Sequence, residues 1–267
     1  QIGSSLSEKQ LVKALKSVDL VFPPMHDRFG EDGILQSFLE KHKIPFVGAG
    51  SEACKKFFDK HLSSNILKSI GFEYVPSFLI LSSEINTNAL KIGLKKFFKE
   101  HSIQRAIVKP AIGGSSIGVH SVHSIAEVLD KAKLLFDSAG HKRVVVEPFC
   151  KGVEFTSIIL ENKFELPVCL LPVEIESNYV GNQIFDYRKK YLPSRQVAYH
   201  CPARFPQTVL DQIATSAESL FKFFGLKDFA RFDGWLLEDG RIVFTDFNPI
   251  SGMEQNSFLF LQSSRIG

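Results

Sequence analysis

Ala230-Arg231-Phe232-Asp233, followed after a short turn by Phe244-Thr245-Asp246-Phe247-Asn248, is the stretch that decides how this chain folds. Asp239-Gly240 lies midway between the two segments, and Asp-Gly is a strong signal for a two-residue hairpin, because both central residues of a type I′ turn need a positive φ angle. A hairpin that turns there places Asp233 directly opposite Asp246. Both carboxylates then lie on one face of the sheet, roughly 5 Å apart, where like charges repel.

The same hairpin register, which pairs Leu237 with Ile242, also fixes two further polar residues. Strand alternation gives Asn248 the same face as Asp246, and Arg231 is the partner of Asn248 across the ladder. Oxygen ligands of this kind suit Mg²⁺ or Mn²⁺, which substrate phosphates and water usually complete. The pattern therefore predicts a metal site on one hairpin. A solvated polar strand face is the alternative, because acidic residues are common on protein surfaces.

The composition predicts a folded protein with a large hydrophobic core. The chain has 267 residues, of which 44% are hydrophobic and 25 are Phe, enough for one large domain or two to three small ones. A net charge of +3 leaves no overall basic surface, so charge does not indicate a nucleic-acid partner.

Cysteine usage and hydropathy indicate the compartment. The four cysteines are widely spaced without a C-x-x-C pair, which argues against zinc and against a disulfide framework and favours a reducing cytoplasm. No apolar run approaches the ~18 residues of a membrane span, and no signal sequence is visible. We therefore expect a soluble, cytoplasmic protein without a membrane partner.

Helical and strand patterns alternate along the whole chain, and no internal repeat is visible. The mixture predicts an α/β or α+β class in several lobes. Helices are expected over residues 33–42, 51–70, 90–100, 124–136 and 206–224, and strands over residues 19–22, 44–48, 75–81, 106–110, 144–147, 154–160 and 166–171. The polar segment 174–201 is weakly periodic, as expected of a long functional loop.

A glycine-rich loop follows the strand that ends at Lys109. Residues 110–118 contain three glycines and two hydroxyls, among them Gly114, Ser115 and Ser116. Such a loop lets backbone N–H groups approach phosphate oxygens, while the lysine supplies positive charge. No Gly-Lys-Ser/Thr ends the loop, so it is not a Walker sequence, and an ordinary glycine-rich hairpin is the alternative.

Four further features fit nucleotide or substrate binding, and each has a plainer alternative. Lys60 lies on a predicted helix, where a lone lysine is usually solvated. Glu147 and Glu154 flank either a hinge with an adenine-binding edge or a simple strand connection. The segment Lys189-Lys190-Tyr191 either closes over a nucleotide or is a flexible basic loop. His26 follows a strand, where α/β folds place ligands, although surface histidines are commoner.

Together these residues share one chemical logic. Several lysines and an N–H-rich loop would bind a triphosphate, Asp233, Asp246 and Asn248 would hold Mg²⁺ on it, and Arg231 would stabilise developing charge. Phosphoryl transfer is the simplest reaction that uses all of these groups.

The order of these motifs resembles the D-alanine:D-alanine ligases of the ATP-grasp superfamily. The resemblance covers nearly the whole chain and rests on His26, Gly30-Glu31-Asp32-Gly33, Gln36, Asp59-Lys60, Val108-Lys109-Pro110, Gly114-Ser115-Ser116, Gly118, Glu147, Glu154-Phe155-Thr156, Asp186-Tyr187, Lys190-Tyr191, Pro202-Ala203, Arg231, Asp233 and Asn248. It implies an ATP-grasp fold in which ATP lies between a central lobe, residues 50–146, and a C-terminal lobe, residues 147–267. Residues 1–49 would be the remnant of a truncated N-terminal α/β substrate domain.

The resemblance also implies a role for each matching residue. ATP would be bound by Lys60, Lys109, Gly114, Ser115, Ser116, Glu147, Glu154 and Lys190, with Glu147 at the adenine and Glu154 at the ribose. Two Mg²⁺ or Mn²⁺ ions would be held by Asp233, Asp246 and Asn248. Substrate would be bound by His26, Arg231, Gly252 and Ser257, with Arg231 and the Gly252 amide at the oxyanion. Ser115 and Tyr191 would join the closure of the loop, and the tyrosine favours a dipeptide over a D-lactate product.

The implied activity is ATP-dependent ligation of two D-alanines for peptidoglycan precursor synthesis, and a homodimer is one assembly that the resemblance suggests. The chain departs from the family pattern at Asp246, where the family has glutamate, and in the turn Asn248–Met253. The family's N-terminal strand and amine-binding glutamate have no counterpart before Asp19, so a fragment or trimmed variant of weak or no activity is expected. The alternatives are another ATP-grasp carboxylate–amine ligase and an ATP-binding homologue without catalysis.

Overall fold

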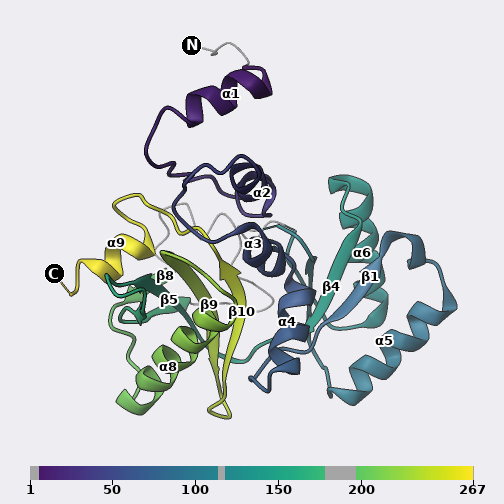
Figure 1. Ribbon diagram of the computed structural model, residues 1–267. Coiled ribbons are helices and arrows are strands. Elements are labelled where there is room, and N and C mark those ends of the chain that lie inside the picture. The colour runs from purple at the N-terminus through teal and green to yellow at the C-terminus, as the bar shows by residue number, and fades with distance from the viewer. Residues whose placement is uncertain (1–5, 114–117, 178–196, 267) are drawn as a thin grey trace.

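The computed structural model describes residues 6–113, 118–177 and 197–266, which form two antiparallel sheets joined by a short connection, with helices around them (Figure 1). Mixed helices and sheets confirm the predicted α/β (α+β) class. Gly114, Ser115, Ser116, Lys190 and Tyr191, which are predicted site residues, lie outside the described residues.

The N-terminal part is helical, and its first helix stands at the top of the view in Figure 1. It contains α1 (Glu8–Leu15), α2 (Ile34–Lys41), α3 (Ser51–Phe58) and α4 (Lys60–Ser69). The strands predicted at 19–22 and 44–48 reduce to one parallel bridge between Val21 and Phe46. The prediction of strands there was wrong because Pro23 and Pro24 lack the N–H donors that a longer ladder needs.

The first sheet has four strands in the order β1-β4-β2-β3. These are β1 (Phe78–Leu81), β2 (Ala106–Pro110), β3 (His120–Val122) and β4 (Arg143–Pro148), and a 3₁₀ turn, η1 (Ser82–Glu84), follows β1. Two helices, α5 (Asn88–Glu100) and α6 (Ile125–Ala139), pack on one face of this sheet, where Ile80, Leu94, Val108, Val128 and Val146 form a fully buried core. Alternation leaves Lys109 and Glu147 on the opposite face.

The second sheet has six strands in the order β10-β9-β5-β7-β8, with β6 also paired to β5. They are β5 (Gly152–Glu161), β6 (Pro167–Cys169), β7 (Val173–Ser177), β8 (Val197–His200), β9 (Phe229–Leu237) and β10 (Ile242–Asn248). Helix α8 (Gln207–Phe223) packs on this sheet, and its bounds agree with the predicted start at Pro206 and end at Gly225. Helix α9 (Phe258–Ser263) follows the last strand.

The helices α3 and α4 belong to the core of the second sheet. Phe57 of α3 stacks on Phe247 of β10 with ring centroids 5.0 Å apart, and it also contacts Phe224 and Phe232. Leu67 of α4 lies in the same buried cluster. The start of α4 is therefore fixed beside strand β10, which carries two of the candidate metal ligands, Asp246 and Asn248.

The long helix predicted over 51–70 breaks at Asp59. This residue leaves the helical region at φ −104° and ψ 105°, and its carboxylate accepts the N–H groups of His61 and Leu62, both at 3.1 Å. The prediction of one helix was wrong because an aspartate at this position caps a new helix. The break makes Lys60 the first residue of α4 and lets its N–H donate to the carbonyl of Ala111 at 2.9 Å.

The functional loop predicted over 174–201 is ordered strand at both ends. Strands β7 and β8 pair antiparallel from Glu174 opposite His200 to Ser177 opposite Val197. The alternation of Val173 and Ile175 with two glutamates is the strand signal here, and both apolar side chains are buried. The loop prediction was wrong for these residues because the two glutamates make the segment look polar, whereas both form ion pairs with Arg204.

Candidate functional site

The β9–β10 hairpin brings its polar residues together. Near the turn, however, its register differs from the predicted one. Leu236, not Leu237, lies opposite Ile242, and the Leu237 N–H donates to the carbonyl of Arg241 at 2.9 Å. Gly240 takes a φ of 85°, so residues 238–240 form a three-residue loop of the type that ends in a left-handed glycine. The predicted pairing of Leu237 with Ile242 was therefore wrong.

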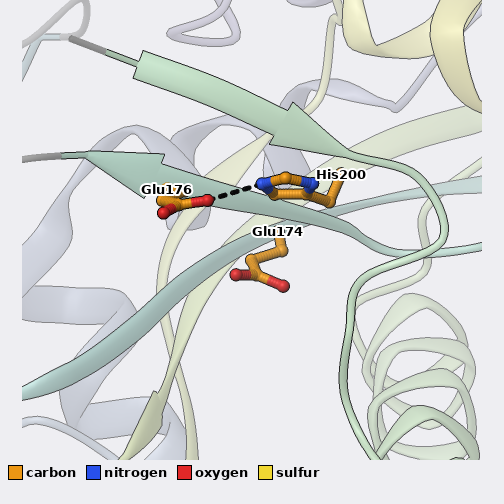
Figure 2. Close-up of side chains that lie close together, drawn as sticks. All are labelled: Glu174, Glu176 and His200. Atoms are coloured by element: carbon orange, nitrogen blue, oxygen red, sulfur yellow. Dashed lines mark hydrogen bonds and ion pairs between the residues drawn. The ribbon is translucent and has the colours of Figure 1, made fainter.

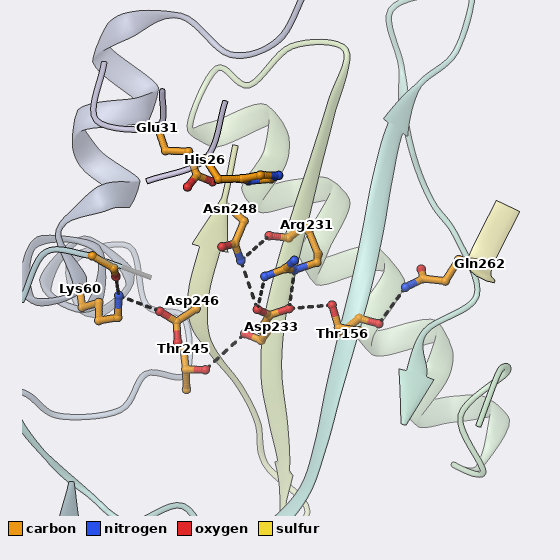
Figure 3. A network of polar contacts seen from close by, with 11 residues as sticks. His26, Glu31, Lys60, Thr156, Arg231, Asp233, Thr245, Asp246, Asn248 and Gln262 are labelled. Atoms are coloured by element: carbon orange, nitrogen blue, oxygen red, sulfur yellow. Dashed lines mark hydrogen bonds and ion pairs between the residues drawn. The ribbon is translucent and has the colours of Figure 1, made fainter. Parts of the chain in front are cut away.

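A β-bulge at Thr245 restores the predicted pairing farther along the hairpin. The register shifts between Phe244 and Asp246, after which Asp246 lies opposite Asp233 and Asn248 lies opposite Arg231. One extra residue on the bulged strand moves every later side chain by one position. The predicted shared face of these four residues is confirmed, and Figure 3 shows them in one polar network.

Asp233 is the centre of this network (Figure 3). Arg231 donates to both of its oxygens at 3.0 Å, a two-pronged ion pair in which both side chains are largely buried. The Thr156 hydroxyl donates to Oδ1 at 2.6 Å, and the Asn248 amide donates to Oδ2 at 3.1 Å. The carboxylate is thereby fixed in one orientation by strands β5, β9 and β10.

Asp246 has its own cation, which offsets the predicted repulsion between the two acids. The Lys60 ammonium lies 3.2 Å from Asp246 Oδ1 and donates to the carbonyl of Gly113 at 2.6 Å. Lys60 therefore joins the start of the glycine-rich loop to the second sheet. Because Arg231 pairs with Asp233 and Lys60 with Asp246, two carboxylates are held opposite each other at little electrostatic cost.

The first sheet contributes a buried ion pair on the face away from its helices. Lys109 of β2 lies 2.8 Å from Glu147 of β4, and both residues are buried. Burial by itself lowers the pKa of the Lys109 ammonium, but the carboxylates of Glu147 and Asp246 outweigh burial and raise that pKa. Lys109 is therefore cationic throughout the neutral range, as a phosphate-binding lysine must be.

His26 and Glu31 lie beside the network, close to Asn248 and Arg231 in Figure 3. His26 Nδ1 is 3.8 Å from Glu31 Oε1, and the Asp27 N–H donates to the other Glu31 oxygen at 2.6 Å. The interaction with Glu31 is the main cause that raises the pKa of His26. Glu31 belongs to the family pattern, but the resemblance implies no role for it, although it is almost fully buried.

The remaining predicted residues occupy the same sheet or the turn after it. Glu154 of β5 lies opposite Trp235 of β9 and shares a face with Thr156, two residues on. Gly252 follows strand β10, and Ser257 caps α9 by accepting the Phe260 N–H at 3.2 Å. The roles assigned to Glu154, Gly252 and Ser257 stay predictions.

Sequence reasoning did not predict that the Thr156 hydroxyl donates a hydrogen bond to Asp233, and it did not predict any role for Gln262. Thr156 could have been found, since it stands two residues after Glu154 and so shares its face. Gln262 carries no such signal, because one glutamine in a short helix of Phe and Leu looks like an exposed residue, whereas it is fully buried.

A second polar cluster joins strands β7 and β8 (Figure 2). Ligand atoms of Glu174, Glu176 and His200 lie within 4.8 Å of one another, as in metal sites. Arg204 Nη2, however, lies 2.5 Å from Glu174 and 2.8 Å from Glu176, and His200 Nε2 lies 2.7 Å from Glu176. Hydrogen bonds from Arg204 and His200 lower the pKa values of Glu174 and Glu176 respectively. The cluster is an ion-pair network that links strand β7 to strand β8 and to Arg204.

Two sheets with facing lysines and acids, and a glycine-rich segment after a strand-end lysine, define the class of ATP-grasp ligases. Solved structures agree: VanG D-Ala:D-Ser ligase from Enterococcus faecalis superposes with a TM-score of 0.79 at 27% identity, covering 94% of this chain and 69% of that one. D-alanine–D-alanine ligase from Bacillus anthracis superposes with a TM-score of 0.78 at 25% identity, covering 98% and 79%. The predicted ATP-grasp fold is confirmed.

The family follows from the sequence comparisons. The family model described as "D-ala D-ala ligase C-terminus" matches residues 66–267. D-alanine–D-alanine ligase from Anaeromyxobacter sp. (strain Fw109-5) is 31% identical over 246 residues, covering 91% of this chain and 73% of the relative. That from Fervidobacterium nodosum is 30% identical over 266 residues, covering 95% and 78%. The chain belongs to the D-alanine:D-alanine ligase family, whose members are ATP-dependent ligases, and the predicted family is confirmed.

The described residues contain no helix long and apolar enough to cross a membrane.

Proposed function

We propose that this chain joins two molecules of D-alanine at the expense of ATP, and so supplies D-alanyl-D-alanine for peptidoglycan precursors in the cytoplasm. The observation that carries the proposal is the opposition of Asp233 and Asp246 across strands β9 and β10, each beside a cation. The proposal includes three domains: an N-terminal remnant, residues 1–49, a central lobe, residues 50–146, and a C-terminal lobe, residues 147–267.

ATP would lie between the two sheets. Lys60 and Lys109 are the phosphate ligands that the geometry favours, because Lys60 already bridges Gly113 and Asp246 and Lys109 is held cationic. Glu147 would face the adenine and Glu154 the ribose. Gly114, Ser115, Ser116 and Lys190 would complete the site, with Ser115 and Tyr191 in its closure.

The donor set on the hairpin fits Mg²⁺ or Mn²⁺. Two carboxylates and an amide share one face, and Mg²⁺ typically takes few protein oxygens with substrate phosphates. Asp233, Asp246 and Asn248 would hold the metal, two ions by the resemblance, and the metal would supply positive charge against the phosphates. Asn248 can present its amide oxygen because its nitrogen already donates to Asp233.

The remaining residues would act on the amino acids. The carboxylate of the first D-alanine takes the γ-phosphoryl group and releases ADP. The amine of the second then attacks the acyl phosphate carbon, loses a proton and expels phosphate. Arg231 and the Gly252 amide would stabilise the oxyanion, Ser257 would hold the second carboxylate and His26 would assist substrate binding.

Phosphate release by the purified chain tests this proposal. With ATP, MgCl₂ and D-alanine we expect slow phosphate release, because the sequence predicts a weakly active chain, together with a dipeptide product seen by mass spectrometry, and no release with L-alanine. ATP binding without any phosphate release would instead support a nucleotide-binding homologue. Sedimentation of the same sample tests the expected homodimer.

A D-alanine:D-serine ligase is the second candidate. VanG from Enterococcus faecalis carries that name and superposes well, and this chain has Ser251 within the turn that follows Asn248. Competition between D-alanine, D-serine and D-lactate as acceptors separates the candidates. We expect D-alanyl-D-alanine to dominate and no D-lactate ester, since Tyr191 favours a dipeptide.

A further inference from the structure

Strand β5 has a break in its ladder beside the candidate metal ligands. On the side away from β9 it pairs with β7 at Glu154–Thr156 and with β6 at Ile159–Glu161. The carbonyl of Thr156 and the N–H of Ile158 face this side between the two partners. Buried backbone groups of this kind need a hydrogen-bond partner.

Gln262 of α9 fills the break with its side-chain amide. Its Oε1 accepts the Ile158 N–H at 2.9 Å, and its Nε2 donates to the Thr156 carbonyl at 3.3 Å. One primary amide thus makes the two bonds that a peptide group of a neighbouring strand would make. Gln262 is fully buried, so these bonds satisfy an amide that would otherwise be costly to bury.

The two backbone positions that Gln262 holds stand opposite the centre of the site. Thr156 is the cross-strand partner of Asp233, and Ile158 is the partner of Arg231. Thr156 also donates its hydroxyl to Asp233 Oδ1 at 2.6 Å. Figure 3 shows Gln262, Thr156 and Asp233 in one line of contacts leading from α9 to the hairpin.

We propose that Gln262 is a positioning residue that sets the orientation of the Asp233 carboxylate through Thr156, and so tunes metal binding at the hairpin. The inference rests on the proposed function only in naming Asp233 as a metal ligand. Gln262 touches no reacting group. Its effect is transmitted by the Thr156 backbone and hydroxyl.

Mn²⁺ affinity of the full chain, measured by electron paramagnetic resonance with ADP present, tests the inference without any turnover. We expect Gln262→Leu to weaken Mn²⁺ binding roughly tenfold, as losses of supporting hydrogen bonds around metal ligands do. Thr156→Val should weaken it similarly, and Thr156→Ser should restore it because the hydroxyl is kept. If Gln262→Leu does not fold, Gln262→Met is used, since methionine fills irregular gaps with less strain.

The double variant and a matched control complete the design. Gln262→Leu combined with Thr156→Val should bind Mn²⁺ no more weakly than Thr156→Val alone, because both act through one path. Ser263→Ala is the control, because its hydroxyl donates to the helix carbonyls of Leu259 and Phe260. Wild-type Mn²⁺ affinity in the Gln262 variant, or losses that multiply in the double variant, would overturn the inference. Absence of Mn²⁺ binding by the wild type would instead refute the metal assignment in the proposed function.

Discussion

The Lys60 ammonium lies 3.2 Å from Asp246 Oδ1 and 2.6 Å from the carbonyl oxygen of Gly113. One cation therefore links the edge strand of the second sheet to the start of the glycine-rich loop. The break of the helix at Asp59 makes this link possible, because it places Lys60 in the first turn of α4, where the Asp59 carboxylate and the Ala111 carbonyl fix the backbone.

Lys60→Met should raise the KM for ATP by roughly ten- to a hundredfold, since it removes charge-assisted hydrogen bonds to the nucleotide and leaves Asp246 without this cation. Steady-state phosphate release at varied ATP measures the effect. Lys55→Met is the matched control, because Lys55 pairs with Glu52 on the exposed face of α3 at 2.9 Å. An unchanged KM for ATP in Lys60→Met would remove Lys60 from the nucleotide site.

Asp233→Asn should lower turnover by at least about a hundredfold, because it removes a proposed metal ligand. The same change breaks the ion pair with Arg231, so the free energy of unfolding should fall by about 1–3 kcal/mol, with the fold retained. Phosphate release and urea unfolding measure the two effects. Asp211→Asn on the exposed face of α8 is the control, and turnover that survives in Asp233→Asn with Mg²⁺ present would refute the metal assignment.

The polar face of the β9–β10 hairpin could be predicted from sequence, but the length of its turn and the bulge at Thr245 could not. Residues two apart share a face in any strand, which is enough to group Arg231 with Asp233 and Asp246 with Asn248. Asp-Gly closes both two-residue and three-residue loops. The observed three-residue loop is accompanied by a contact that is distant in sequence, the Glu238 N–H donating to the Lys151 carbonyl at 3.0 Å. The shift at the turn and the bulge at Thr245 cancel, so the predicted pairing of the acids holds.

The residues that support the site were harder to predict. Local sequence gives no reason for Gln262 to be buried, because its partners are backbone groups of a strand about a hundred positions away, at |i−j| of 104 and 106. Lys109 and Glu147 were predicted as separate ligands, whereas they form one ion pair across β2 and β4. Both cases depend on which elements become neighbours in the fold, α9 and β5 in one and β2 and β4 in the other. Sequence periodicity does not specify these neighbours.

The pKa of His26 should respond to Glu31. It is raised above 6.5, chiefly by Glu31, so the stability that the pair contributes is full below pH 6.5 and is lost as pH rises through the raised pKa. Glu31→Gln should shift the His26 titration to lower pH, as followed by its ring proton resonances. His120, whose pKa is lowered mainly by burial, is the internal reference and should not move. A His26 midpoint that stays unchanged in Glu31→Gln would show that this carboxylate does not govern the imidazole.

Ser251 and Ser257 should show opposite effects on stability. Within the described part of the chain the fully buried Ser251 hydroxyl has no hydrogen-bond partner, so Ser251→Ala removes a polar group whose burial is unfavourable. We expect the free energy of unfolding to rise by about 1 kcal/mol, measured by urea denaturation. Ser257→Ala removes the cap of α9 and should lower it by about 1 kcal/mol. A loss of stability in Ser251→Ala equal to that in Ser257→Ala would mean that the Ser251 hydroxyl is hydrogen-bonded in solution.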